Sequence, residues 1–379
     1  MAHERTFMSS TQPRTVVVGG GIIGVSTARH LARAGADVTL ITEGELTSNA
    51  SGRSLSWLNS AGMRSEEYHR LRMAGIDRYR TLAARHPGLS WLRFDGGLTW
   101  QAPENTDDLH RVHEHELAHG YDSHLIEPGR VADHTPGIDP AAVSPAGAIW
   151  NPGEGWVDLP NLAQHLIKEF AEHGGRLVTN AGQARIETAG GSVSGVRTAD
   201  GESYAADTVV LATGPAVPAM AAELGVAIPD QTPISLLVTT KPVDTPLRAV
   251  LNTPRAAVRP APHGALAVDS DWTTAGIRPT AEGGFEIAEE IVAELLAEAS
   301  RLLAGNPRLE PERLAMGPKP IPGDGDPVLG RVDEIGGLWV AFTHSGATLA
   351  LIAGELLAYE ISTGRAHPML APFNARRFR

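Results

Sequence analysis

The chain has 379 residues, of which 42% are hydrophobic and 20% charged, a composition typical of a globular protein with about two or three domains. The formal net charge of −12 argues against binding to nucleic acid or to an anionic membrane, because both are also negative. The absence of cysteine excludes disulfides, thiolate metal sites and a flavin attached through sulfur. No segment predicts a signal peptide or a membrane span, so we expect a cytoplasmic protein.

The first motif lies near the N-terminus, between a predicted strand at 15–18 and a predicted helix at 22–34. It spans Gly19 to Gly24 and contains the pattern G-x-G-x-x-G. These glycines permit a tight turn, the close approach of a pyrophosphate and the packing of the helix on the strand. A second strand is predicted at 37–42, and Glu43 follows it, where a carboxylate can accept hydroxyls of an adenosine ribose. The pattern predicts a dinucleotide site and does not distinguish FAD from NAD.

The remaining elements predict a mixture of helices and strands. Asp158 is a candidate N-cap of a helix that ends at Gly174-Gly175. Segment 176–211 predicts a β-meander, and the alternating, Pro-rich segment 232–280 predicts an antiparallel sheet. Further helices are predicted at 65–85, 105–119, 286–304 and 347–361, with a strand at 338–342. The fold class is therefore α/β, with a Rossmann-type nucleotide-binding domain and a second α+β domain with a mostly antiparallel sheet.

Two further glycine-containing stretches follow predicted strands. The run from Val209 to Pro215 ends in Ala-Thr-Gly, which either brings bare backbone close to a ligand or is an ordinary turn. The C-terminal part contains the segment Gly317 to Gly330 and then the sequence His344 to Leu349, which opens a predicted helix. The N-terminus of that helix is a second anion-stabilising position, suited to the negative charge of a reduced flavin.

Four features in matching order together resemble the FAD-dependent D-amino-acid oxidase family, which includes glycine oxidase and sarcosine oxidase. They are the Gly19–Gly24 motif with Glu43, the loop 49–54, the segment 154–158 that opens a helix, and the C-terminal segments 317–330 and 344–349. The resemblance runs from about Arg14 to about Gly364. It implies a discontinuous FAD-binding domain (14–90, 150–230 and 318–379) and a substrate domain (91–149 and 231–317); residues 1–13 are expected to be disordered.

The resemblance also implies which residues bind the cofactor. FAD is expected to be non-covalent, because the chain has no cysteine and the loop 47–59 has no histidine. The expected FAD-binding residues are Gly19, Gly21, Ile22, Ile23, Gly24, Glu43, Ser51, Gly52, Arg53, Ser54, Gln183, Gly214, Gly346, Ala347, Thr348 and Leu349.

Candidate catalytic residues are Lys319, His344 and Arg259. Lys319 stands where amino-acid oxidases of the family usually have an arginine that binds the substrate carboxylate; the alternative is a solvent-facing lysine. His344 is either a polar substrate contact or a core histidine, and Arg259 either an inward anion contact or a surface residue. Trp57 and Asn59 are expected to line the substrate pocket, although core packing is equally open for Trp57.

The resemblance predicts an FAD-dependent oxidase or dehydrogenase that oxidises the C–N bond of an amino acid or amine by hydride transfer to flavin N5, giving an imine that hydrolyses. The electron acceptor, O2 or another, stays open, because segment 242–318 lacks the lysine that sarcosine oxidases use for oxygen. Two alternatives remain: an FAD enzyme of another class, such as a hydroxy-acid dehydrogenase or a reductase, or a flavin-bearing subunit that needs a partner.

His115 and His119 lack a third ligand, so no metal site is predicted.

Overall fold

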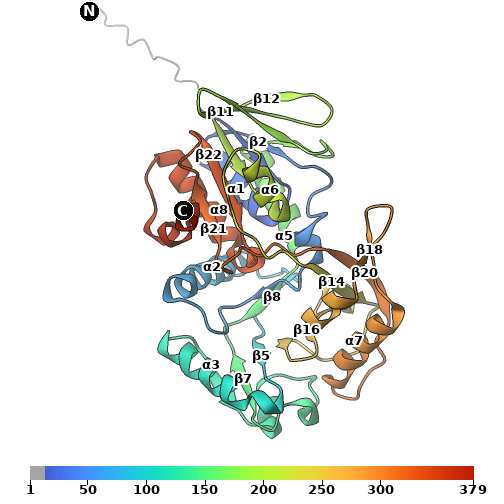
Figure 1. Ribbon diagram of the computed structural model, residues 1–379. Helices are drawn as coiled ribbons and strands as arrows, with labels where there is room; N and C mark the ends of the chain where they lie inside the picture. The colour runs from blue at the N-terminus through green and yellow to red at the C-terminus, as the bar shows by residue number, and fades with distance from the viewer. Residues whose placement is uncertain (1–12) are drawn as a thin grey trace, which may run out of the picture.

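The computed structural model describes residues 13–379; the disorder predicted for 1–13 therefore lies, apart from Pro13, outside the described residues. Two large sheets dominate the structure, and they lie one above the other in Figure 1 with helices packed on them. The prediction of an α/β fold with a second, mostly antiparallel sheet is confirmed.

The upper sheet forms around β1 (Arg14–Val18), whose valines are buried on both faces, as in the centre of a parallel sheet. Its neighbours on the two sides are β2 and β13, and both pair with it in parallel. One edge strand is antiparallel. In spatial order the sheet comprises β21 (Val328–Arg331), β22 (Leu338–Phe342), β13 (Thr208–Leu211), β1, β2 (Asp37–Ile41) and β9 (Arg176–Val178).

Helices cover one face of this parallel sheet. α1 (Ile22–Arg33), α5 (Leu159–Glu172) and α8 (Gly346–Thr363) share one hydrophobic core there, and α2 (Glu66–Arg85) packs on α8. The carboxylate of Asp158 accepts a hydrogen bond from the Asn161 N–H at 3.1 Å, which confirms its prediction as the N-cap of α5.

The opposite face is covered by a small antiparallel sheet together with α6 (Val217–Ala222). The small sheet comprises β10 (Arg185–Ala189), β11 (Ser192–Arg197) and β12 (Ser203–Ala205). The prediction that 176–211 forms one meander is wrong at both ends, because β9 and β13 join the parallel sheet instead. Periodicity alone could not reveal this, since a short apolar strand looks the same in either sheet.

The lower sheet has antiparallel pairs throughout, except for β15 and β5, which are parallel. α7 (Glu289–Arg301) packs against it and buries Val292, Leu295, Leu296 and Ala299. In spatial order the sheet comprises β20 (Pro311–Pro318), β14 (Ile234–Thr240), β17 (Leu266–Asp269), β16 (Ala257–Pro260), β15 (Val250–Asn252), β5 (Gly97–Thr99), β7 (Ala148–Asn151) and β6 (His124–Ile126).

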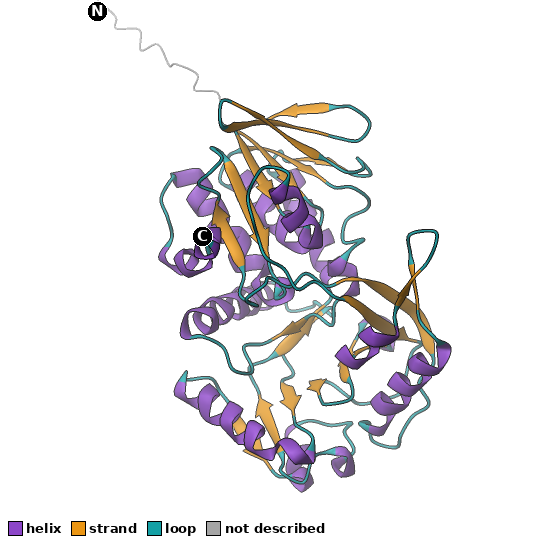
Figure 2. Ribbon diagram, viewed as in Figure 1, coloured by secondary structure: helices purple, strands orange, loops and turns teal. Residues whose placement is uncertain are grey.

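A three-stranded sheet lies between the two large sheets, as Figure 2 shows. It comprises β3 (Trp57–Leu58), β8 (Gly155–Val157) and β4 (Leu92–Arg93). The hairpin of β18 (Arg278–Pro279) and β19 (Phe285–Glu286) contacts β20, and α3 (Thr106–Ala118) contacts β7; the short helix α4 is Val131–His134. Within residues 13–379, no helix has both the length and the apolar content needed to cross a membrane. The domain boundaries stay a prediction.

The crossing of α1 and α8 leaves no space for a side chain at Gly354. A Cβ atom there would lie 2.4 Å from Ser26 Oγ and 2.8 Å from the backbone nitrogen of Thr27. Backbone cannot yield as a flexible side chain can, so the absence of a Cβ at Gly354 sets the separation of these two helices.

We expect Gly354→Ala to destabilise the protein by about 1–3 kcal/mol through overpacking, although Gly→Ala within a helix normally stabilises. Gly346→Ala in the same helix is the matched control when both variants are compared without FAD: Gly346 lines the cavity, and its Cβ would meet no protein atom closer than 4.0 Å. Thermal unfolding followed by circular dichroism should show a lower midpoint for Gly354→Ala only. Equal midpoints in the two variants would contradict this account of the helix crossing.

Candidate functional site

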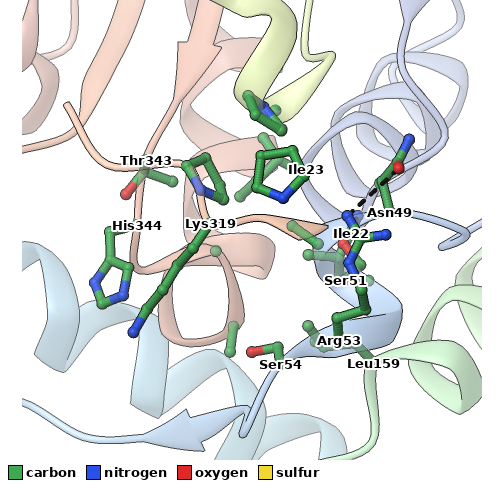
Figure 3. A pocket seen from close by; sticks show the side chains of 18 of the residues that line it. Ile22, Ile23, Asn49, Ser51, Arg53, Ser54, Leu159, Lys319, Thr343 and His344 are labelled. Carbon is green, nitrogen blue, oxygen red and sulfur yellow. Dashed lines mark hydrogen bonds between the residues drawn. The ribbon is translucent and has the colours of Figure 1, made fainter. Parts of the chain in front are cut away.

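A cavity of about 870 Å³ lies where the parallel sheet meets the eight-stranded sheet, a volume near the upper end of the range for small-molecule sites. One part of its lining comes from the loops after β1, β2 and β13 and from the start of α8. The other part comes from β3, α2, the end of β17 and the segment after β20. Figure 3 shows Lys319 and His344 beside each other, apart from Asn49, Ser51 and Arg53.

The glycine motif forms the turn between β1 and α1. Gly19 has φ +124°, and a Cβ there would lie 2.3 Å from the carbonyl oxygen of Ala212, at the end of β13. Gly24 does not line the cavity; its Cβ would lie 2.0 Å from Gly19 O, so it serves helix packing as expected. Because the chain passes from β1 through α1 to β2 on one side, while β13 lies on the other side, the carboxyl ends of β1 and β13 open a crevice typical of dinucleotide sites.

The loop between β2 and β3 closes over the start of α1. Ser51 Oγ accepts a hydrogen bond from the Ile22 N–H at 3.0 Å, and the Thr47 N–H donates to Gly20 O at 3.0 Å. Arg53 and Ser54 line the cavity. Gly52 does not line it, because the position is a tight turn in which a Cβ would lie 2.4 Å from Thr47 O.

The far end of this crevice presents Glu43, Gln183 and Gly214 to the cavity. Glu43 is exposed, and its carbonyl accepts from the Gly182 N–H at 3.0 Å. The two segments that hold Glu43 and Gln183 are thus bonded to each other, although 140 residues separate them in sequence. This pairing brings a carboxylate and an amide together at the position expected for an adenosine.

The N-terminus of α8 opens on the same cavity. Gly346, Ala347 and Thr348 line it. Leu349 does not, and its N–H already donates to Ser345 O at 2.9 Å; as the fourth residue of the helix it has no free donor. The expected amide contact at Leu349 is therefore corrected to the three residues before it. Thr348 Oγ1 donates to Trp57 O at 3.1 Å and ties β3 to this helix.

These features fit FAD. Two helix N-termini face one cavity, and each supplies amides and a partial positive charge for an anionic or electron-rich group. One N-terminus is preceded by glycine backbone at which a Cβ would collide, and the acidic residue Glu43 lines the cavity after β2, where the ribose is expected. Bound there, FAD would supply the redox chemistry, and the protein would supply orientation and charge.

Lys319 and His344 lie at the other part of the cavity (Figure 3). Lys319 Nζ is 3.1 Å from the carboxylate of Asp271, which is 92% exposed, so the pair is weakened by solvent. The His344 side chain is exposed to the cavity. Desolvation by the surrounding protein, and next the charge of Lys319, lower the pKa of His344 to about 4. Its open side faces the cavity, so a neutral imidazole stands beside an ammonium group.

Arg259 is placed differently from the expectation. It is 3% exposed and does not line the cavity. Its guanidinium donates to the carbonyls of Leu55 and Pro260 and lies 5.1 Å from the ring centre of Trp156. Arg259 therefore links β16 to the loop before β3 behind the cavity wall, and its side chain is directed at backbone carbonyls. Trp57 and Asn59 both line the cavity.

Sequence reasoning missed three buried or half-buried charged residues around β3. Arg64 and Arg72 line the cavity, and Glu154, which is fully buried, lies behind Trp57. The sequence indicates Glu154 only as part of a helix-opening motif. The helical spacing of α2 places Arg72 on the same face as Tyr68, the one signal that could have indicated an inward arginine.

Glu154 holds the wall of the cavity from behind. Its Oε2 accepts from Trp57 Nε1 at 2.7 Å, and its Oε1 accepts from the hydroxyl of Tyr121. Burial raises the pKa of Glu154 to about 8, with the neighbouring Glu116 adding to the effect. The carboxyl group is therefore mainly neutral at pH 7 and acts as a hydrogen-bonding anchor for Trp57.

The raised pKa of Glu154 makes its contribution to stability depend on pH. Between the ordinary value of 4.5 and about 8, the folded state binds more protons than the unfolded state, so stability falls as pH rises through this window. In Glu154→Gln this contribution is absent. The free energy of unfolding of the wild type, measured relative to that of Glu154→Gln, should therefore fall as the pH rises from about 5 to about 8, by up to about 1.4 kcal/mol per pH unit. The unfolding midpoint of the wild type should fall relative to that of the variant over the same range.

Thermal unfolding at several pH values measures this shift. Glu154→Leu is the control, because it removes the acceptor of both Trp57 and Tyr121 and should lower the midpoint at every pH. A difference between wild type and Glu154→Gln that stays constant over this pH range would show that Glu154 is not a protonated anchor.

Comparisons with known proteins agree with this geometry. The model of the DAO family, described as FAD dependent oxidoreductase, matches residues 14–360. The chain is 24% identical over 376 residues to one of the subunits of opine oxidase from Agrobacterium tumefaciens, covering 96% of each chain. It is 28% identical to glycine oxidase of Pseudomonas aeruginosa, covering 95% of this chain and 97% of the relative.

The fold is also similar to solved structures. Glycine oxidase from Geobacillus kaustophilus superposes with a TM-score of 0.79 at 23% identity, covering 96% of this chain and 99% of that one. The family model covers most of the chain, and the two helix N-termini and the glycine turn form the cavity that such a cofactor needs. The chain therefore belongs to the DAO family of FAD-dependent oxidoreductases.

Proposed function

We propose that this protein oxidises the C–N bond of an amino acid or amine by hydride transfer to N5 of a non-covalently bound FAD. The observation that carries the proposal is the pair of side chains at the substrate part of the cavity: a lysine that can bind a carboxylate and a neutral histidine beside it. Relatives named as oxidases or dehydrogenases of amino acids support the same substrate class.

At the substrate part of the cavity, Lys319 would bind the substrate and His344 would interact with the N–H of its amine. Lys319 supplies a point charge for a substrate carboxylate, which would replace its exposed partner Asp271. His344, whose lowered pKa leaves it neutral at pH 7 because desolvation and the charge of Lys319 disfavour its protonated form, can accept a hydrogen bond from a substrate N–H and favour the neutral amine. The substrate loses a hydride from carbon and a proton from nitrogen, and water converts the resulting imine to a carbonyl compound and an amine.

The test is anaerobic mixing of the purified protein with amino acids, secondary amines and hydroxy acids, with the visible flavin band as the readout. The proposal expects bleaching by at least one amine or amino acid and release of the flavin from the denatured chain. Bleaching by hydroxy acids alone would overturn the proposed reaction. Admitting air afterwards distinguishes an oxidase from a dehydrogenase by the rate at which the band returns.

A second candidate is a flavin-bearing subunit that needs a partner. It is favoured by the full-length match to a relative that is named as a subunit, that of the Agrobacterium opine oxidase. In this case the isolated chain would bind FAD, and no compound of the panel would bleach it.

Lys319→Ala should slow flavin reduction by the best amine about tenfold or more, the cost of a lost charge-assisted hydrogen bond. FAD content should stay unchanged, because the residue lies away from the glycine turn. Lys241→Ala is the matched control, since Lys241 is exposed and paired with Glu310 outside the cavity. Equal reduction rates in the two variants would remove Lys319 from the substrate site.

A further inference from the structure

Two arginines with no acidic partner line the cavity near the start of α8. They are Arg64, in the loop before α2, and Arg72, in the second turn of α2. Among the described residues 13–379, neither guanidinium forms an ion pair with a carboxylate, whereas most other arginines with a hydrogen-bonded side chain have an Asp or Glu partner. A buried positive charge without a counter-charge is costly, so this pair needs an explanation.

Arg72 is rigidly held and only 3% exposed. Its Nε donates to Asn59 O at 2.8 Å, and its Nη2 donates to Asn59 Oδ1 at 2.8 Å. Its Nη1 donates to Ser345 Oγ and, at 3.3 Å, to the hydroxyl of Tyr68. All four acceptors are neutral, so these bonds orient the guanidinium and leave its charge uncompensated.

Arg64 has more free donors. Its Nε donates to Ala61 O at 3.2 Å, and its two terminal nitrogens have no hydrogen-bond partner within residues 13–379. Both arginines lie near the ring of Tyr68, whose centre is 5.7 Å from Cζ of Arg64 and 5.3 Å from Cζ of Arg72. Arg64 therefore presents a planar fork of donors at the cavity wall, the geometry that suits a carboxylate.

The loop that holds Arg64 is fastened to α3. Arg64 O bonds to the ring of His115 at 2.8 Å, and the Gly62 N–H donates to Glu116 Oε1 at 2.8 Å. The Ser60 N–H donates to the hydroxyl of Tyr121 at 2.9 Å. These contacts pre-organise the loop, so Arg64 can meet a ligand without a large loss of backbone freedom.

The charges near Arg64 and Arg72 are mostly positive. Burial, and next the charge of Arg72, lower the pKa of Arg64 below its ordinary value, and the carboxylate of Asp326 opposes this effect more weakly. Lys319 stands on the same part of the cavity, and its carboxylate partner Asp271 is exposed. Asp269, at the end of β17, also lines this part of the cavity and is close enough to Lys319 for their charges to interact. The two acids Asp269 and Asp271 therefore compensate Lys319, and the positive charge left without a carboxylate is that of Arg64 and Arg72.

We propose that Arg64 and Arg72 form an anion subsite for a second carboxylate, so that the preferred substrates are amines with two carboxylate groups, one bound by Lys319 and one by Arg64. The claim that such amines are substrates rests on the proposed function. The binding of a dicarboxylate rests on the geometry alone. Arg72 orients the site, and Arg64 supplies the free donors.

Binding is tested on the FAD-loaded protein without turnover. The oxidised flavin spectrum is titrated with dicarboxylates from malonate to adipate and, separately, with monocarboxylates of the same carbon number and with inorganic phosphate. At least one dicarboxylate should bind about tenfold or more tightly than its monocarboxylate, as one further charge-assisted pair predicts. In Arg64→Gln this preference should fall to less than about threefold.

Arg70→Gln is the matched control, because Arg70 lies on the exposed side of α2, close in sequence to Arg64, and pairs with Glu66; it should keep the full preference. Arg64→Lys keeps the charge without the fork and should recover part of it. Retention of FAD by Arg64→Gln shows that the variant is folded and that Arg64 does not hold the cofactor.

The proposal is wrong if the wild type shows no preference for dicarboxylates, if Arg64→Gln keeps the preference of the wild type, or if inorganic phosphate binds as tightly as the tightest dicarboxylate. Loss of FAD from Arg64→Gln, with Arg70→Gln unaffected, would likewise overturn it and assign Arg64 to the cofactor. None of these results depends on amine oxidation. If dicarboxylates bind as expected and no amine bleaches the flavin, the proposed function fails and the anion subsite stands.

Discussion

The contact between α1 and α8 fixes how these two helices lie relative to each other. At Gly354 the backbone of α8 lies against the backbone of α1 around Ser26, at a distance that excludes even one methyl group. Since both helices are fixed in this crossing, their first turns open on the same cavity. Two helix N-termini are thereby directed at one space, and their partial positive charges add where an anionic cofactor would bind.

The surroundings of the cavity depend on the same arrangement. Thr348, in the first turn of α8, is hydrogen-bonded to the backbone of Trp57, and Trp57 is held from behind by the neutral acid Glu154. Arg72 reaches from α2 to Ser345 just before α8. The cofactor end and the substrate end are thus joined through a few side chains around the start of one helix.

The parts of the site that could be predicted from the sequence are those encoded by local patterns. The glycine turn, the acid after the second strand and the start of α8 each need only a few consecutive residues. The error at Leu349 has the same origin: the motif shows where the helix begins, but counting its hydrogen bonds decides which amides are free.

The remaining features depend on contacts between residues far apart in sequence. Arg259 could not be placed on either side of its strand without the register of the sheet, and the structure directs it behind the wall. Glu154 bonds to Trp57 across 97 residues and Arg72 reaches Ser345 across 273, so no local pattern signals either one. The sequence wrongly predicts a meander that includes β9 and β13, because pairing partners are not visible in short apolar runs.

The central claim is that a single FAD molecule binds between the N-termini of α1 and α8. Removing the cofactor and titrating the apoprotein with FAD, FMN and NAD, by flavin fluorescence and calorimetry, tests it most directly. We expect one FAD per chain and much weaker binding of FMN, which lacks the adenosine expected at Glu43 and Gln183, and of NAD, which lacks the flavin expected at α8. Equal affinity for FMN and FAD, or no binding of either flavin, would contradict it.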